Sequence, residues 1–195
     1  KSSTIAEGSK ISPSAYIGPH CSIGKNCSIG DNTIIHPNVT IYDNTTIGNN
    51  VELHASVVIG TVGFGFIPDE IGEFINFPHI GGVIIGNNVV IGGGAVICRG
   101  ALGNTTIGYN TKINNLVHIA HNVKIGQNCL FGAHAMISGS NIIGDNVWVG
   151  PGVNVRDGMK IEDNAFLSMG STVTKGVKKG EHVSGYLAQP HAHFM

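Results

Sequence analysis

Charged residues are scarce in this chain of 195 residues, of which they make up 12%, and the formal net charge at pH 7 is −1. A nucleic-acid partner needs a basic face to meet its phosphates, so this charge balance argues against one. No apolar run is long enough to span a bilayer, and no charged-then-apolar leader opens the sequence. We therefore expect a cytoplasmic protein without a membrane span.

Cysteine is also rare, and the four cysteines form no CxxC pair: Cys21, Cys27, Cys98 and Cys129. Three of them fall on a small-residue position of the repeat described below. This placement favours buried structural thiols over a disulfide or a metal site. Aromatic residues contribute 6% of the chain while Gly contributes 29 residues, which would fit a low-complexity segment if the sequence had no strict period.

An apolar residue recurs at every sixth position over most of the chain. The step of six holds without a polar exception over residues 5–59, 85–97 and 107–173, which hold 10, 3 and 12 such positions, 25 in all. An amphipathic helix repeats near 3.6 residues and a simple strand near 2, so neither accounts for a period of six. The period is typical of a hexapeptide β-helix.

The positions around each apolar residue describe one short strand and one corner. Two residues earlier the side chain is small or β-branched, as at Cys21 and Thr33, one residue later Gly is common, and three residues later Asn is common. Gly and Asn accept the backbone of tight turns. Three hexads would close a triangular coil of 18 residues, so the 25 hexads predict about eight coils, stacked roughly 4.8 Å apart.

We therefore predict an all-β parallel β-helix of hexapeptide repeats over residues 1–175. Residues 61–82 break the period and are predicted to be one inserted loop. Its four Phe, which include Phe64 and Phe66, favour a loop that walls the cleft of His121, in a neighbouring subunit, over a loop that packs on its own prism. Residues 176–195 are predicted to be a short C-terminal cap or tail that covers the open edge of the last coil.

The segment Asn-Asn-Leu-Val-His-Ile-Ala-His-Asn, residues 114–122, carries the polar groups best suited to chemistry. We place His121 at a corner and His118 on a flat face, both outside the core, and a neutral imidazole suits general-base work near neutral pH. Gly139 follows His121 by 18 residues, so its N–H would lie one coil above and could bind an oxyanion. Since no Ser or Cys lies beside His121 in the sequence, the pair indicates direct attack by a substrate amine.

Three other features have two interpretations each. Arg99, in the second break of the period, either pairs with an anionic ligand or is a solvated corner residue. The basic cluster that contains Lys175 and Lys178 either attracts the phosphates of an acyl donor or is a solvated cap. His36 and His54 lie 18 residues apart and are better interpreted as stacked corner side chains than as a metal pair, because no third ligand accompanies them. We expect no metal site.

Four segments, in this order and spacing, resemble the UDP-3-O-acylglucosamine N-acyltransferase family: GTVGFGFIPDEIGEF, HIGGVIIGNNVVIG, CRGALGNTTIG and KINNLVHIAHNVKIG. The resemblance covers most of residues 11–190. It implies a left-handed β-helix and a homotrimer with sites in the grooves between subunits. It also implies that His121 is the catalytic base and that Gly139 supplies the oxyanion amide.

The resemblance implies the ligands as well. The acyl donor would be an acyl-carrier protein or acyl-CoA, used as a co-substrate with no bound cofactor, and the acceptor would be the amine of a nucleotide-linked amino sugar in lipid A and lipopolysaccharide synthesis. Candidate acceptor-binding residues are then Asn114, Asn115, His118, Asn122, Phe64 and Phe66. Candidate acyl-donor-binding residues are Arg99, Gly158, Lys175 and Lys178.

The chain departs from the family pattern in several places. It starts directly in the repeat, where the family has an N-terminal uridine-binding domain. Asn114 stands where an aspartate is common, His118 where a glutamine is found, and Gly158 where some members have a second histidine. These departures keep open an acetyl-CoA-dependent N-acetyltransferase that acts on another nucleotide-linked amino sugar outside lipid A synthesis.

Two further classes of protein have the same β-helical fold. A non-enzymatic scaffold would favour regular rows of Thr and no interrupting loop, whereas this sequence has few Thr pairs and a Phe-rich loop. A γ-type carbonic anhydrase needs a pair of histidines five residues apart on one strand as zinc ligands, and none of the ten histidines has a partner at that spacing. Both classes fit the sequence less well than an acyltransferase does.

Overall fold

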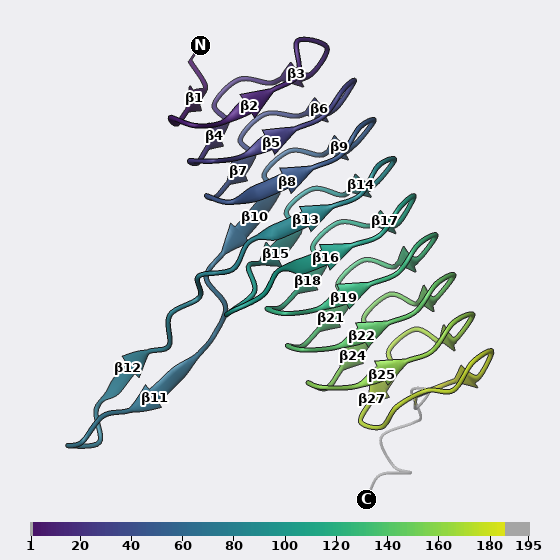
Figure 1. The fold of residues 1–195 in the computed structure, drawn as a ribbon. Coiled ribbons are helices and arrows are strands. Elements are labelled where there is room, and N and C mark those ends of the chain that lie inside the picture. The colour runs from purple at the N-terminus through teal and green to yellow at the C-terminus, as the bar shows by residue number, and fades with distance from the viewer. Residues whose placement is uncertain (1, 186–195) are drawn as a thin grey trace, which may run out of the picture.

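The computed structural model describes residues 2–185, which form 28 strands and no helix. None of the described segments is a helix that could cross a membrane. Three parallel sheets, of nine, eight and nine strands, make the three faces of a prism (Figure 1). This confirms the predicted parallel β-helix of hexapeptide repeats. The three sheets together hold 26 strands, one more than the 25 hexads, because a last strand, β28 (His182–Val183), joins the third sheet after the repeat pattern ends.

The faces are called sheets A, B and C. Sheet A contains, in spatial order, β1 (Thr4–Ile5), β4 (Ser22–Ile23), β7 (Thr40–Ile41), β10 (Val58–Thr61), β15 (Val96–Cys98), β18 (His118–Ile119), β21 (Met136–Ile137), β24 (Asn154–Val155) and β27 (Thr172–Val173). Sheet B contains β2 (Lys10–Ile11), β5 (Ser28–Ile29), β8 (Thr45–Ile47), β13 (Val83–Ile85), β16 (Thr105–Ile107), β19 (Lys124–Ile125), β22 (Ile142–Ile143) and β25 (Lys160–Ile161). Sheet C contains β3 (Tyr16–Ile17), β6 (Ile34–Ile35), β9 (Glu52–Leu53), β14 (Val90–Ile91), β17 (Lys112–Ile113), β20 (Leu130–Phe131), β23 (Trp148–Val149), β26 (Phe166–Leu167) and β28 (His182–Val183).

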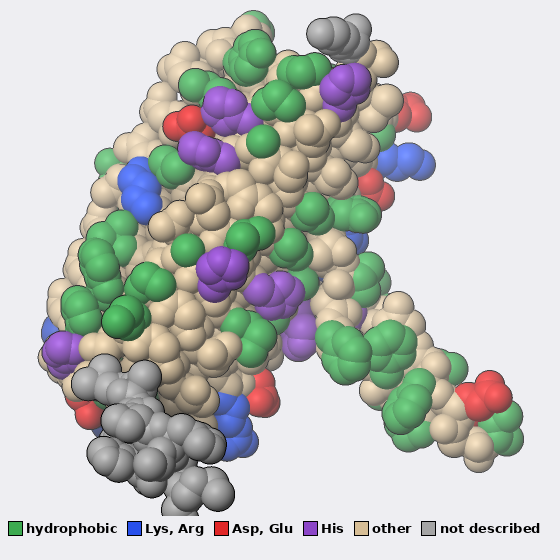
Figure 2. Space-filling model, turned by 180° about the vertical axis from the view of Figure 1, so that it is seen from behind, with side chains coloured by type: hydrophobic (Ala, Val, Ile, Leu, Met, Phe, Trp, Pro, Cys, Tyr) green, Lys and Arg blue, Asp and Glu red, His purple; other side chains and the backbone are tan. Residues whose placement is uncertain are grey.

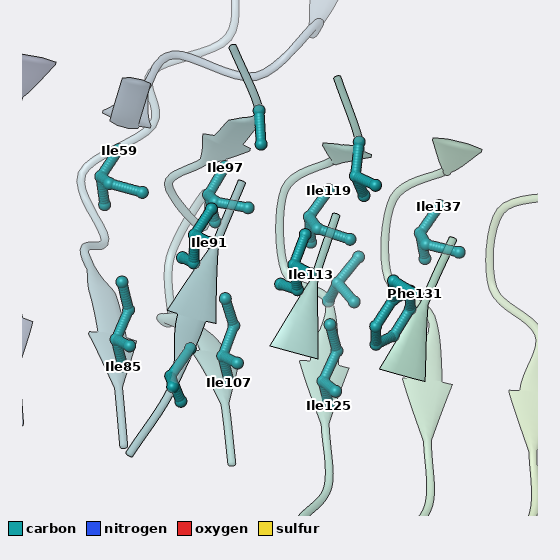
Figure 3. Close-up of a cluster of buried hydrophobic side chains, with 14 of the residues drawn as sticks. Ile59, Ile85, Ile91, Ile97, Ile107, Ile113, Ile119, Ile125, Phe131 and Ile137 are labelled. Carbon is teal, nitrogen blue, oxygen red and sulfur yellow. The ribbon is translucent and has the colours of Figure 1, made fainter. Parts of the chain in front are cut away.

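The core is made of stacked rows of the repeat residues. Along sheet A, Ile97 pairs with Ile119 and Ile119 pairs with Ile137, so each side chain lies on its equivalent one coil away (Figure 3). The residue two positions earlier also points inward, and Val117 is 1% exposed. Val117 therefore belongs to the core, since its place in the hexad is the inward place that Cys129 also holds.

Two features of the corners bear on the site: a residue in the left-handed conformation and a hydrogen bond from the backbone of one coil to a side chain of the next. At most corners, the residue three positions after the repeat residue takes the left-handed conformation, with φ between 53° at Asn50 and 63° at Ser56 for the residues other than Gly. One position earlier, an Asp or Asn side chain often accepts the backbone N–H of the equivalent residue in the preceding coil. Asp145 Oδ1 accepts the N–H of Gln127 at 2.8 Å in this way, and we call the arrangement the corner ladder.

The minor histidine and cysteine features are structural. All four cysteines are buried and unpaired by disulfides, as predicted. The rings of His36 and His54 lie 5.3 Å apart, and their Nε2 atoms lie 2.9 and 3.5 Å from Glu52 Oε1. Among residues 2–185, no group of three or more His, Cys, Asp or Glu side chains is arranged to hold a metal ion.

The inserted loop leaves sheet A after β10 and returns at β13. In between, β11 (Phe66–Pro68) and β12 (Phe74–Asn76) form an antiparallel hairpin that projects away from the prism (Figures 1 and 2). We call residues 64–77 the arm. Its most exposed apolar side chains are Phe64, Ile71 and Phe74, at 87%, 81% and 78%. The arm therefore does not bury these side chains against its own prism.

The C-terminal part of the described chain stays close to the last coils. Val177 forms an isolated parallel bridge with Ile161, and β28 pairs with β26. The division at residue 175 and the capping role of residues 176–195 remain predictions, and residues 186–195 lie outside the described residues.

Candidate functional site

A cleft of about 690 Å³ opens on sheet A beside β18 and β21, where the inserted loop leaves the prism. Histidine side chains gather around this place in the space-filling view (Figure 2). The structure brings five of the predicted site residues together in its lining: Phe64, Phe66, His118, His121 and Gly139. The base of the loop therefore lies beside the His121 of its own chain.

His121 lies at the corner that follows β18, and its ring lies over Gly139 one coil away. A methyl group at Gly139 would lie 2.6 Å from His121 Cε1 and 2.8 Å from Nε2, so only a residue without a side chain leaves room for the imidazole. At the same place in several other corners, Asp and Asn side chains form the corner ladder. At this corner the ring of His121 fills the space that such a side chain would occupy.

Two backbone N–H groups at this corner, those of His121 and Gly139, lack the ladder bond within the described residues. Gly139 cannot accept the N–H of His121, because it has no side chain. The N–H of Gly139 itself has no acceptor among the residues that the structure describes, whereas the N–H groups of Lys25 and Gln127 are bonded to Asp43 and Asp145 at 2.7 and 2.8 Å. An anionic oxygen in the cleft could take the place of those carboxylates.

The environment of His121 favours its neutral form. Burial lowers the pKa of His121, and the charge that nearby His79 can carry lowers it further. Nδ1 of His121 is buried and has no hydrogen-bond partner in the described part of the chain. Both ring nitrogens face Gly139, and a methyl group there would lie 2.8 Å from Nε2 and 3.1 Å from Nδ1. His118, on the strand before this corner, is half-buried, and burial lowers its pKa as well.

The sequence did not point to His79, which contacts His121. It lies at the end of the inserted loop and is 8% exposed, and the two ring centroids are 5.3 Å apart at an interplanar angle of 73°. The loop has no period, so no spacing could place this histidine. The only signal was its position just before the chain re-enters the repeat.

The cleft also contains two potential nucleophiles that we did not expect beside His121. Cys98 and Ser138 both line it, because β15 and β21 flank β18. Burial raises the pKa of the Cys98 thiol to about 11, so its reactive thiolate form is scarce near neutral pH. The Ser138 hydroxyl forms no hydrogen bond with His121 within residues 2–185. Neither group is activated as the nucleophile of an acyl-enzyme mechanism would be.

The predicted asparagines lie apart from the cleft or hold the backbone. Asn114 and Asn115 line a separate pocket of about 570 Å³ that also contains Trp148 on sheet C. Asn115 Oδ1 accepts the N–H of Gly93 at 2.8 Å. Asn122 Oδ1 accepts the N–H of Ala101 at 2.5 Å and so fixes the second break of the repeat.

The four candidate donor-binding residues are also outside the lining of the cleft. Arg99 donates from Nε to Gly60 O at 2.7 Å and from Nη2 to Asp43 O at 3.1 Å, which ties the start of the loop to the prism. The N–H of Gly158 donates to Gly139 O at 2.9 Å. Lys175 follows β27, three strands along sheet A from β18, and the backbone N–H of Lys178 donates to the Glu181 carboxylate at 2.8 Å.

Similar proteins of known structure are acyltransferases that act on UDP-sugars. The chain is 32% identical to a UDP-N-acetylglucosamine acyltransferase from Francisella novicida, with a TM-score of 0.84 over 93% of this chain and 64% of that chain. It is 28% identical to a UDP-N-acetylglucosamine O-acyltransferase from Moraxella catarrhalis RH4, with a TM-score of 0.85 over 94% of this chain and 69% of that chain.

A curated relative matches over a shorter stretch. A UDP-3-O-acylglucosamine N-acyltransferase from Coxiella burnetii is 51% identical over 37 residues, which are 19% of this chain and 11% of that protein. The match therefore spans only a small part of the curated protein, and the chain spans under two thirds of the Francisella enzyme.

The repeat itself identifies the family. The family model described as "Bacterial transferase hexapeptide (six repeats)" matches residues 2–31, 26–61, 104–139 and 142–175, which together cover more than half of the chain. These matches fall on the coils before and after the inserted loop and include β18, His121 and Gly139. The chain belongs to the bacterial transferase hexapeptide family.

Proposed function

We propose that the protein is an N-acyltransferase that moves an acyl group from an acyl thioester to the amine of a nucleotide-linked amino sugar. The observation that carries the proposal is the placement of His121 over Gly139 in a cleft on a transferase scaffold. The similarity to acyltransferases of UDP-sugars supports the same reaction class.

In this reaction the acceptor amine attacks the thioester carbonyl carbon, and Nε2 of His121 takes a proton from the attacking nitrogen. The carbonyl oxygen becomes negative and is stabilised by the N–H of Gly139. The C–S bond then breaks, and the leaving thiolate takes the proton from the imidazolium. The products are an amide and a free thiol, and His121 is neutral again. In the neutral tautomer that this step requires, Nδ1, which has no hydrogen-bond partner within the described residues, carries the ring proton and Nε2 is the acceptor.

The proposal includes contacts for both substrates. We assign His118, Phe64 and Phe66 to acceptor contacts, because they line the cleft with His121. The donor is acyl-CoA or an acyl-carrier protein, used as a co-substrate with no cofactor bound. Lys175 lies roughly 14 Å along sheet A from β18 by the spacing of strands, a distance that a phosphopantetheine arm can span. With Arg99, Gly158 and Lys178, it stays a proposed donor contact.

We also propose a homotrimer with each site in a groove between two subunits. One subunit leaves the apolar side chains of the arm exposed and leaves the pocket of Asn114 and Asn115 on a face away from His121. A neighbouring prism would cover the arm, and the pocket of Asn114 and Asn115 on that neighbour would then reach the acceptor.

We place the reaction in the cytoplasm, in lipid A synthesis. The four free cysteines fit a reducing compartment.

The assembly can be tested by mutation of the arm. Sedimentation equilibrium of the wild type should give about 61 kDa, three times the 20.3 kDa of one chain. The double variant Ile71→Asp, Phe74→Asp should dissociate at micromolar concentration, because each buried carboxylate would face an apolar partner. Ile5→Asp, an exposed residue of the first strand, is the matched control and should stay trimeric. A monomeric wild type would refute the trimer.

The reaction can be tested by a matrix of donors and acceptors. Acyl-CoA and acyl-carrier-protein thioesters of short and long chains are incubated with UDP- and dTDP-linked amino sugars and with UDP-N-acetylglucosamine. We expect an amide product with at least one amino sugar. An ester formed only on UDP-N-acetylglucosamine would show that the acceptor group is a hydroxyl and not an amine, as the name of the Moraxella O-acyltransferase suggests. An amide formed only from acetyl-CoA would support the acetyltransferase alternative. No transfer to any acceptor would refute the proposal.

A further inference from the structure

His79 is held in one orientation by the loop that carries it. Its Nδ1 lies 2.9 Å from Phe77 O, and a carbonyl oxygen can only accept, so Nδ1 carries a hydrogen in both charge states of the ring. Nε2 is then the only nitrogen of His79 that can gain or lose a proton. The side chain of His79 is almost fully buried, although most residues of the neighbouring arm are exposed.

Two glycines of the Gly-Phe-Gly segment leave room for the pair of imidazoles. A methyl group at Gly63 would lie 2.8 Å from both His79 Nε2 and His121 Cδ2, and one at Gly65 would lie 2.9 Å from His79 Cε1. Neither glycine needs a positive φ, so the contact with the rings is what excludes a side chain here. Residues 63–65 therefore close over both rings on the side away from Gly139.

The pair lies in surroundings that contain no acidic group. Of the residues that line the cleft, the titratable ones are His118, His121 and Cys98, and His79 packs against His121 from the loop. No Asp or Glu lines the cleft within residues 2–185, so no carboxylate in the lining balances a positive charge on either ring. Two imidazoles in contact in such a place repel each other when both are protonated.

We propose that His79 is a positioning residue that holds the ring of His121 over Gly139 and opposes protonation of that ring, in place of the carboxylate that orients many basic histidines. The proposal rests on the proposed function in one respect, the role of His121 as the base. Its physical content is the coupling between two rings, which can be measured without turnover. The charge that His79 can carry already contributes to the lowered pKa of His121.

The test measures His121 directly in the intact protein. Histidine labelled with ¹³C at Cε1 is incorporated, and the His121 signal is assigned by its loss in His121→Ala. The test variant is His79→Asn, because the Asn side-chain N–H can keep the bond to Phe77 O while the ring and its charge are removed. The control is His134→Asn, an exposed corner residue with φ 60° in a place where this chain usually has Asn.

We expect the midpoint of the His121 titration to move to higher pH in His79→Asn and to stay in place in His134→Asn. The acid limb of kcat/KM should move to higher pH with it, which a purely structural role of His79 would not cause. If His79→Asn fails to fold, His79→Gln removes the same charge and should move the midpoint in the same direction. An unmoved His121 midpoint in the folded variant, or an equal movement in the control, would overturn the proposal.

Different outcomes test the role of His121 and the role of His79. If His121→Ala keeps its turnover, the base is wrong, yet the coupling of the rings is still decided by the titration. If His121→Ala is inactive and the His121 midpoint is the same with and without the His79 ring, the base stands and the role of His79 is wrong.

Discussion

His121→Ala should lower turnover by about two to four orders of magnitude, the usual range for loss of a positioned general base. The amine must lose a proton as it attacks, and His121 is the neutral group of the described cleft that lies over Gly139. His118 also lines the cleft and has a lowered pKa, and the paired variant below tests it. The other candidates are the Cys98 thiol, with a raised pKa of about 11, and Ser138, which is not bonded to His121. The rate would be measured as thioester cleavage at saturating acceptor.

The same variant should leave the prism intact. His121 is a corner residue outside the core rows, and its removal breaks no hydrogen bond recorded for its ring within residues 2–185. The melting temperature and the sedimentation of His121→Ala should therefore match the wild type. His118→Ala is the paired variant and should lose less activity, because His118 is assigned to acceptor contact. Loss of turnover in His118→Ala alone would transfer the role of base to His118.

Gly139→Ala should lower turnover by about two to three orders of magnitude, comparable to loss of an oxyanion donor at roughly 3 kcal/mol. The added methyl group would meet Cε1, Nε2 and Nδ1 of His121 at 2.6, 2.8 and 3.1 Å, and these are its three nearest neighbours. The ring must move away, which displaces the base from the atom it serves and changes access to the Gly139 N–H. The rate assay is the one used for His121→Ala.

The substitution at Gly139 should have little effect on folding. Gly139 is not among the glycines with positive φ, so Ala can adopt its backbone conformation without strain. Gly103→Ala is the matched control, since a methyl group there meets nothing within 4 Å and that glycine also lacks a positive φ. The control should keep normal turnover. If Gly139→Ala were also near normal, the contact between this position and the base would not matter for the reaction.

The period of six was sufficient to predict both the fold and the pairing of His121 with Gly139. Residues 18 apart stack in a triangular coil, so a spacing in the sequence became a contact between neighbouring coils. The corners were equally readable, since Asn at the third place after each repeat residue takes the left-handed conformation. The spacing that places each side chain is local and repeats along the chain, so one sequence without relatives was enough to predict it.

The period of six did not predict the positions of the other site residues. His79 belongs to the aperiodic loop, and its contact with His121 depends on how residues 61–82 fold back, which no spacing encodes. Asn114 and Asn115 are close to His121 in sequence but belong to the corner before β18, whereas His121 belongs to the corner after it. A whole strand separates the two corners, so the asparagines line a pocket on sheet C and not the cleft of His121 in the same subunit.

Neutral His121 accepts the proton in the proposed reaction, and a comparison of its residue-specific titration with kcat tests this role. The base is active when neutral, and its lowered pKa keeps it neutral until the pH falls below the ordinary range of histidine, so kcat should level off near neutral pH and fall about tenfold per pH unit below the midpoint. Burial lowers the pKa of His118 too, so the kinetic midpoint alone cannot name the residue. We predict that the kinetic midpoint with bound acceptor equals the NMR midpoint of His121 in the same complex. A kcat that follows the titration of His118, or that does not change as His121 becomes protonated, would contradict the account.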